Sequence, residues 1–368
     1  MFIAAGGGFD PAAAGAGLEP PIAWVYAREG GAATSVLIDP SGDVISAGSE
    51  GEQMAVVRHS AVDGSEKWRY RTIPGGPTAM LQAGDGTILV AAHLGGPPNY
   101  PWPSGGVVVK LAADGTELWR LEPVEATSFL ALAIDAGGDV LAGGAAGDPL
   151  AAKTDLILVK LDGSTGREIW RRVIAGATEA GNGIQSIALD ARGDVLAGGW
   201  IENPAIGIHD FAVLKFSGES GEEIWRRLLS EGTAYSIAVD REGDVAAAGE
   251  ANFGTASWCD FVTAKFSGVD GSELWRAVLG SGLGGDVCDV AVSTALDPAG
   301  DVLSTGWVGG AFTTTKFARD SGALLWEHQL PGGQAKSVRV DAAGDVFAVG
   351  DAFYPANSDM TAVALRGS

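Results

Sequence analysis

Few residues in this chain are suited to acid–base, nucleophilic or metal chemistry. The 368 residues include two cysteines, Cys259 and Cys288, and four histidines, His59, His93, His209 and His328. No two histidines have the His-x-His or His-x-x-Glu-His spacing that holds a metal, so we expect no metal and no cofactor. An enzyme built on this chain would use His209 with a carboxylate, because such a pair can transfer protons near neutral pH. The candidate carboxylates are Glu202, Glu250 and Asp351.

These side chains belong to a scaffold that repeats itself. A phrase of alternating apolar residues followed by Asp-x-x-Gly-Asp-Val occurs six times, as in SIALDARGDVLAGG, and a seventh, degenerate copy starts at Met80. The alternation is typical of β-strands, and the Asp and Gly positions favour tight turns. A second phrase, such as DFAVLKFSGESGEEIWRR, follows every copy except the last one along the chain, and it supplies a tryptophan. These tryptophans are Trp68, Trp119, Trp170, Trp225, Trp275 and Trp326.

Each unit of about fifty residues contains four strand-like segments, which is typical of a β-propeller blade. We therefore predict an all-β, seven-bladed propeller with four antiparallel strands per blade. The last unit stops at TAVALRGS, after its third strand. We expect the N-terminal strand PIAWVYARE, with Trp24, to complete the last blade and close the ring, which removes free sheet edges. The domain would span residues 23–368 and follow a flexible Gly/Ala/Pro-rich segment, residues 1–22.

Residues that recur once per unit are interpreted as structural. The paired aspartates of Asp-x-x-Gly-Asp lack the dense oxygen ligands and closing Glu of a calcium loop, so they are assigned to turns. The blade tryptophans are expected to fill the wedge between neighbouring blades. A basic residue also recurs in the third strand, and we expect it to pack or form ion pairs there. These bases are Arg58, Lys110, Lys160, Lys215, Lys265 and Lys316.

Two resemblances follow from these phrases. SIAVDREGDVAAAG and SIALDARGDVLAGG resemble the bacterial β-propeller repeat family called SBBP, which implies a protein of the bacterial surface or secretome. KLDGSTGREIWRR is similar, more weakly, to the tryptophan-docking motif of quinoprotein alcohol dehydrogenases. That likeness would imply pyrroloquinoline quinone chemistry, but those enzymes have eight blades, a calcium site and usually adjacent cysteines. This chain has seven units and two cysteines far apart, so no catalytic residue is carried over.

Function is sought where the repeat is broken. The second-to-third strand loops vary in length and share one end of a propeller, and variable loops on a rigid scaffold usually carry binding sites. They hold four tryptophans that are not blade tryptophans, and carboxylates and tyrosines accompany them. Flat apolar rings beside hydrogen-bonding groups suit sugars, peptides or small aromatic compounds, although the same rings could instead plug the channel or pack loops together. The predicted ligand-binding residues are Trp102, Trp200, Trp258, Trp307, Tyr100, Glu250, Asp351 and Tyr354.

The two cysteines lie in loops of neighbouring units at this same end. Cys259 ends a second-to-third strand loop, and Cys288 ends the loop into the next unit, so a Cys259–Cys288 disulfide is expected; two separate buried thiols are the alternative. A disulfide would also indicate an oxidising compartment.

Charge limits the partners. The formal net charge is −22, which repels nucleic acid and anionic lipid headgroups. No apolar run is long enough to cross a bilayer, and the N-terminus lacks the features of a signal peptide, so it reads as a linker that could remain after removal of a leader. We therefore expect a secreted, periplasmic or surface-bound binding or scaffolding propeller that recognises a glycan, peptide or small aromatic ligand, with a protein partner as a further option. The alternative is a lyase, a hydrolase or, less favoured, a quinone-dependent oxidoreductase with its site at the same channel mouth, using His209, Glu250 and Asp351.

Overall fold

The computed structural model describes residues 31–94, 105–121, 127–147, 153–176, 181–229, 231–253, 257–282, 285–354 and 357–366. These residues form 27 strands and no helix. The first sheet contains β1 (Gly31–Ile38), β2 (Val44–Glu50), β3 (Gln53–His59), β4 (Glu66–Gln82), β5 (Ile88–Leu94), β6 (Gly105–Leu111) and β7 (Glu117–Leu121). The next two sheets contain β8 (Thr127–Ile134), β9 (Val140–Ala146), β10 (Asp155–Leu161), β11 (Glu168–Ile174), and β12 (Gly183–Leu189), β13 (Val195–Asn203), β14 (Ile208–Phe216), β15 (Glu223–Leu229).

The remaining strands make three further sheets. The first of these contains β16 (Gly232–Val239), β17 (Val245–Ala251), β18 (Ser257–Phe266) and β19 (Glu273–Leu279), with the short β20 (Gly285–Cys288) beside β18. The next contains β21 (Val290–Leu296), β22 (Val302–Val308), β23 (Ala311–Phe317) and β24 (Leu324–Leu330). The last contains β25 (Gly333–Val340), β26 (Val346–Tyr354) and β27 (Asn357–Leu365).

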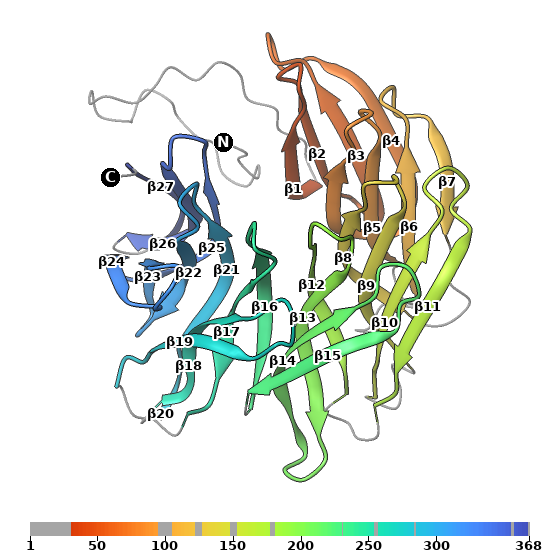
Figure 1. The fold of residues 1–368 in the computed structure, drawn as a ribbon. Coiled ribbons are helices and arrows are strands. Elements are labelled where there is room, and N and C mark those ends of the chain that lie inside the picture. The colour runs from red at the N-terminus through yellow and green to blue at the C-terminus, as the bar shows by residue number, and fades with distance from the viewer. Residues whose placement is uncertain are drawn as a thin grey trace, which may run out of the picture.

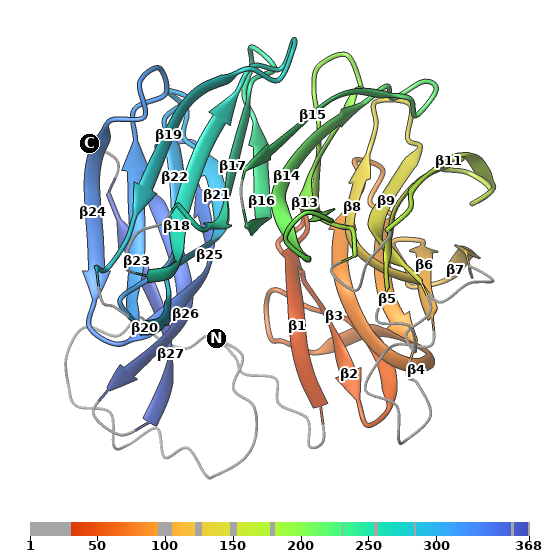
Figure 2. The ribbon, with the colours of Figure 1, turned by 90° about the horizontal axis from the view of Figure 1, so that it is seen from below.

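These sheets correspond to the seven predicted units. The first sheet is two blades joined by β4, which pairs with β3 up to Pro74 and with β5 from Gly75 onward. The blades follow one another around a centre, and the first strands of successive blades contact each other (Figure 1). In both views the last sheet comes round to the side of the molecule where β1 lies (Figure 2). The predicted all-β propeller architecture is confirmed, and the strands fit about seven blades. The predicted closing strand PIAWVYARE, residues 21–29, lies outside the described residues.

The blade tryptophans join neighbouring blades, as predicted. Trp225 on β15 is 7% exposed, and its ring lies against Gly271 of the next blade, where an added Cβ would come 2.7 Å from the indole. Gly271 has a φ of 71°, which also favours glycine. The indole Nε1 of Trp225 donates a hydrogen bond to the carbonyl of Gly268 at 3.4 Å. The same stacking occurs in Trp68–Gly115, Trp119–Gly166, Trp170–Gly221 and Trp275–Gly322.

Five of the six recurring third-strand bases form ion pairs, and the sixth, Lys110, donates to the carbonyl of Gly163, which confirms their structural interpretation. Lys215 Nζ lies 2.8 Å from Asp190 and 3.4 Å from Asp194, and it donates to the carbonyl of Gly268 at 2.9 Å. That carbonyl also accepts the Trp225 indole, so one peptide group receives two donors from the preceding blade. Equivalent ion pairs are Arg58–Asp43, Lys160–Asp135, Lys265–Asp240 and Lys316–Asp297.

Protonation of these buried aspartates should reduce the stability of the fold in acid. A hydrogen bond from Lys67, opposed by burial and supported by backbone and Arg58 donors, lowers the pKa of Asp43 from 3.8 to about 2. A carboxyl whose pKa is lowered by folding stabilises the fold fully above its unfolded pKa, and this contribution is lost as the pH falls through the folded value. We expect the free energy of unfolding, measured by urea titration, to decrease between about pH 4 and pH 2.

The control for this prediction is Lys67→Met. Acidification also relieves the repulsion of the net charge of −22, so the informative quantity is the difference between the two proteins. Removing the Lys67 donor should raise the folded pKa of Asp43 and flatten the acid dependence. An identical pH dependence in both proteins would contradict the assignment.

Candidate loop-face site

The candidate site lies at the end of blades four to seven that carries the second-to-third strand loops, here called the loop face. Trp200, Glu250, Trp307 and Asp351 occupy the same register near the end of the second strand in successive blades. Their cross-strand partners are Gly183, Thr233, Val290 and Gln334. The structure therefore places these four predicted residues at equivalent positions of neighbouring blades.

In the fourth blade, Trp200 and His209 lie side by side. Their rings are tilted by 57° with centroids 6.4 Å apart, and the Trp200 indole covers the backbone of Gly183. His209 Nε2 is 3.1 Å from the Thr233 hydroxyl of the fifth blade. Burial lowers the pKa of His209, although the nearby Asp210 charge opposes this shift. The imidazole is therefore held neutral at pH 7.

In the fifth blade, the half-buried Glu250 lies on the loop face. The hydroxyl of Tyr235 donates to Glu250 Oε1 at 2.9 Å. Burial raises the pKa of Glu250, while the Tyr235 hydrogen bond opposes that shift. Burial, followed by the neighbouring Glu250 charge, also raises the pKa of Tyr235. Burial thus shifts the acidity of Glu250 towards the protonated form.

The other oxygen of Glu250 faces the two cysteines. Oε2 lies 3.2 Å from Cys259 Sγ and 3.1 Å from Cys288 Sγ. The structure joins the cysteines in a disulfide, with Cα atoms 4.8 Å apart, where β20 runs parallel to β18. The backbone N–H of Asp289 also donates to the carbonyl of Cys259 at 3.0 Å. The bridge ties the loop of the fifth blade to the segment that enters the sixth.

Carboxylate and sulfur atoms of Glu250, Cys259 and Cys288 lie within 4.8 Å of one another, a spacing that also suits a metal ion. Sulfurs joined in a disulfide are not thiolates, however, and only the thiolate is a good metal ligand. The disulfide therefore decides the chemistry of this cluster.

Thiol counting tests the disulfide. In aerobically purified, denatured and unreduced protein, we expect a thiol reagent to detect no free thiol, and reduction before denaturation should release two thiols per chain. The bridge should stabilise the fold by about 2–4 kcal/mol, measured as the difference in unfolding free energy between oxidised and reduced protein. Two free thiols in the untreated sample would reject the bridge and weaken the extracellular assignment with it.

In the sixth blade, Trp307 continues the row of contacts. Its indole Nε1 donates to the carbonyl of Cys288 at 2.8 Å, and the ammonium of Lys336 in the seventh blade lies 5.4 Å from its ring centroid. Contacts thus extend from His209 through Thr233, and from Tyr235 through Glu250 and the disulfide to Trp307. Both Trp200 and Trp307 are half-buried, so they contribute to loop packing as well as to the surface.

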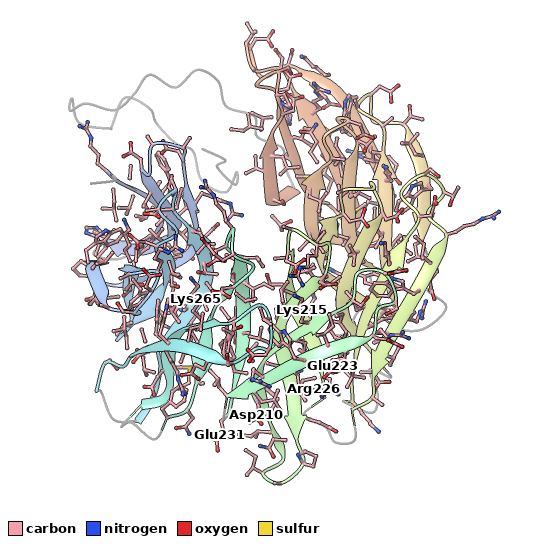
Figure 3. The ribbon with its side chains drawn as sticks, in the orientation of Figure 1. Asp210, Lys215, Glu223, Arg226, Glu231 and Lys265 are labelled. Carbon is pink, nitrogen blue, oxygen red and sulfur yellow. A yellow bond between two sulfur atoms is a disulfide. The ribbon has the colours of Figure 1, made fainter. Side chains whose placement is uncertain are left out.

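Buried aspartates, which the sequence analysis did not single out, hold these loops. The Asp210 carboxylate accepts hydrogen bonds from Glu231 N and Asn203 Nδ2, both at 3.0 Å (Figure 3). Glu231 has a φ of 47° and accepts the Asn252 side-chain amide at 2.7 Å. Asp289, fully buried, accepts the N–H groups of Ser281 and Gly309, each at 2.6 Å. For Asp210, the signal available in the sequence was the Asp that recurs near the start of the third strand in DFAVLK, DFVTAK and DLILVK; Asp289 lies outside this pattern.

The remaining predicted residues are placed less closely. Asp351 lies on β26, two blades beyond Glu250, opposite Gln334. Trp102 and Tyr100 lie outside the described residues, as do the side chains of Trp258 and Tyr354. The structure thus connects His209 and Glu250 through Thr233 and Tyr235, but it places Asp351 on a different part of the loop face.

A shallow hollow is present at the opposite end of the blades, between β1 and β4. It is lined by residues that include Leu37, Pro40, Leu81 and Gln82, and its acidic residue, Asp39, is paired with Arg58. This hollow offers no group for chemistry beyond a turn aspartate already engaged in the blade scaffold.

Comparison with known proteins supports the architecture. Residues 25–201 match the family model described as outer membrane protein assembly factor BamB, of the PQQ_2 type. No curated protein matches this chain significantly in sequence. The part of the chain that the structure describes contains no helix able to cross a membrane.

Solved structures with the same fold come from several classes of propeller. The WD40 domain of Pan2 from Neurospora crassa matches with a TM-score of 0.55 and 10% identity over 86% of each chain. A europium-containing methanol dehydrogenase matches with a TM-score of 0.61 and 9% identity over 86% of this chain and 72% of that one. Quinohemoprotein alcohol dehydrogenase from Comamonas testosteroni matches with a TM-score of 0.59 and 13% identity, over 84% of this chain and 61% of that one. The matches support a propeller built from PQQ-like repeats, and the SBBP-type assignment stays a prediction.

Proposed function

We propose that this chain is a non-catalytic binding or scaffolding propeller of the bacterial envelope or secretome, and that its partner binds the loop face over blades four to six. The observation that carries this proposal is the row Trp200, Glu250 and Trp307, one residue per blade at the same register. Aromatic rings on both sides of a carboxyl suit a peptide segment, a glycan or a small aromatic compound.

Two further observations support the proposal. The buried Asp210 and Asp289 fix the loops through backbone N–H groups, so the surface is organised before a partner arrives, which lowers the entropic cost of binding. The matched family is described as an assembly factor of the outer membrane, which supports an envelope location and a protein as partner.

One observation favours catalysis as a second candidate. His209, held neutral, and Glu250, with a raised pKa, are linked through Thr233 and Tyr235, and shifted acidities of this kind are common at active sites. In the described structure both groups are occupied by neighbouring hydroxyls, and Asp351 lies two blades away. Binding therefore remains the better supported function.

A binding screen with matched variants tests the proposal. Thermal shift against glycans, peptides and small aromatic compounds should identify ligands that raise the melting temperature of the wild type. Trp307→Ala should abolish that shift, because it removes one ring of the row, while costing only about 1–2 kcal/mol of stability for a half-buried indole with one hydrogen bond. Val269→Ala, at an 80% exposed turn residue of the other end, should leave both quantities unchanged.

Acrylamide quenching gives an independent readout. The contribution of Trp307 to fluorescence should be quenched more readily than that of the buried blade tryptophans, and a bound ligand should protect it. If Trp307→Ala costs as much stability as truncation of a blade tryptophan and leaves ligand binding unchanged, the ring is a loop-packing residue and the proposed surface is wrong.

A further inference from the structure

We propose that Cys259 and Cys288 form a redox-active disulfide that undergoes exchange with an external dithiol, and that Glu250 supplies the proton to the leaving sulfur. This activity goes beyond the binding function, and it rests on three groups that meet at one point. Glu250 Oε2 is 3.2 Å from Cys259 Sγ and 3.1 Å from Cys288 Sγ.

The short contacts between Glu250 Oε2 and the two sulfurs limit where a proton can lie. A disulfide sulfur has no hydrogen, so a hydrogen bond between Oε2 and either sulfur requires the proton to be on the carboxyl. Tyr235 donates to Oε1 and thereby leaves Oε2 directed towards the sulfurs. Burial raises the pKa of Glu250, which is consistent with a protonated carboxyl in the oxidised protein.

The two sulfurs differ in access, and this sets the direction of attack. Cys259 is 7% exposed, whereas Cys288 is only partly buried. An incoming thiolate therefore reaches Cys288. A new bond forms between the incoming sulfur and Cys288 Sγ, the Cys259–Cys288 bond breaks, and its electron pair leaves on Cys259 Sγ.

Glu250 is placed to neutralise this leaving group. A thiolate on buried Cys259 beside a carboxylate would put two negative charges in a poorly solvated place, which is costly. Transfer of the Oε2 proton to Cys259 Sγ avoids this pair of negative charges. It leaves only the Glu250 carboxylate charged, and the new Cys259 thiol can donate a hydrogen bond to it. The second thiol of the external dithiol then attacks the first dithiol sulfur, which is bonded to Cys288 in the mixed disulfide, and releases Cys288. The dithiol becomes a disulfide and is oxidised, and the cysteine pair is reduced.

Exchange would change the loop face. The disulfide ties β20 to β18, and the carbonyl of Cys288 accepts the Trp307 indole. Reduction releases the cross-link between the fifth and sixth blades next to this hydrogen bond. The fluorescence of Trp307 should therefore report the redox state.

The test is the rate of disulfide reduction by dithiothreitol, divided by the thiolate concentration and measured by thiol counting between pH 5 and 9. In the wild type this corrected rate should fall as the pH rises through the pKa of Glu250, because a proton donor must be protonated. Among the described residues, the titratable groups in contact with Glu250 are Tyr235 on β16 and the two cysteines on β18 and β20. His209 on β14 contacts Thr233, the cross-strand partner of Glu250. Glu250→Gln should lower the corrected rate at least about tenfold and remove its pH dependence, as expected when a general acid is lost.

Two variants keep the outcome decisive. Glu231→Gln changes another loop-face carboxylate, bonded to Asn252, and should behave as the wild type. Tyr235→Phe keeps the carboxyl but removes its orienting donor, so it should slow reduction even if Glu250→Gln fails to fold. An unchanged rate and pH profile in a folded Glu250→Gln protein would overturn the proposal. If Glu250→Gln does not fold, the same result in folded Tyr235→Phe would overturn it. Two free thiols before any reducing agent is added would also overturn it. Ligand binding by the oxidised wild type is measured separately, so failure of this proposal does not touch the proposed function.

Discussion

Trp225→Ala should lower the free energy of unfolding by about 3–5 kcal/mol, as expected for truncation of a large buried aromatic residue. The loss has two parts. The indole leaves a cavity against Gly271 of the next blade, a residue that has no side chain to fill it. The carbonyl of Gly268 also loses one of its two donors, although Lys215 still donates to it.

Ile224→Ala is the matched control for this prediction. Ile224 is the neighbouring residue on β15 and is 48% exposed, so its truncation should cost less than about 1 kcal/mol. Urea unfolding of both variants at pH 7 measures the difference. Similar losses in the two proteins would mean that the tryptophan does not carry the contact between blades.

The repeating parts of the molecule could be predicted from the sequence, because each is specified by local chemistry that recurs. Asp-x-x-Gly-Asp demands a turn wherever it occurs, and the third-strand Lys215 needs a counter-charge once it is buried, which Asp190 supplies. The alignment of Trp200, Glu250 and Trp307 followed from the same register. These features depend on positions counted within one unit.

The site could be predicted only in part, because its contacts join different units. Nothing in the sequence around Tyr235 indicates that its hydroxyl meets Glu250, since Tyr235 stands in a first-strand phrase where other copies have different residues. The role of Glu231 was equally hidden, because it depends on a positive φ at the crossing into the fifth blade. The sequence left open whether the loop tryptophans bind a ligand or pack loops together, and it could not indicate that Trp200 packs on Gly183, which follows from the absence of a side chain on the partner strand.

The first and last blades expose apolar side chains at positions where the equivalent side chains of interior blades are buried. Val36 on β1 is 50% exposed, whereas the equivalent Ile237 and Val338 are 7% and 0% exposed. Phe347 on β26 is 44% exposed, whereas the equivalent Leu196 is fully buried. In the interior, Ile237 packs on Gly198 of the preceding blade, the position that Val349 holds in the last blade. By this equivalence, ring closure would place Val36 against Val349, which is itself 43% exposed.

The turn after β3 has the same geometry as the turns that receive a blade tryptophan. The N–H of Gly64 donates to the carbonyl of Ser60, and Gly64 has a φ of 70°, matching Gly271 in the turn that receives Trp225. The tryptophan that would dock there belongs to the fourth strand of the last blade. The sequence supplies it as Trp24, which should stack on Gly64 and donate to the carbonyl of Ala61.

Deletion of residues 1–30 should therefore leave β27 without its outer partner strand, and loss of the docked Trp24 should expose the apolar faces of the first and last blades. We expect this truncated protein to aggregate or to melt at a much lower temperature than the full chain, because unpaired edges and lost blade contacts remove stability. Deletion of residues 1–18, which keeps Trp24 and its strand, should leave the melting temperature unchanged. The point variant Trp24→Ala in the full chain should lower stability about as much as Trp225→Ala, since both remove one docked indole. Equal melting temperatures for the two truncations would show that the N-terminal strand does not close the ring.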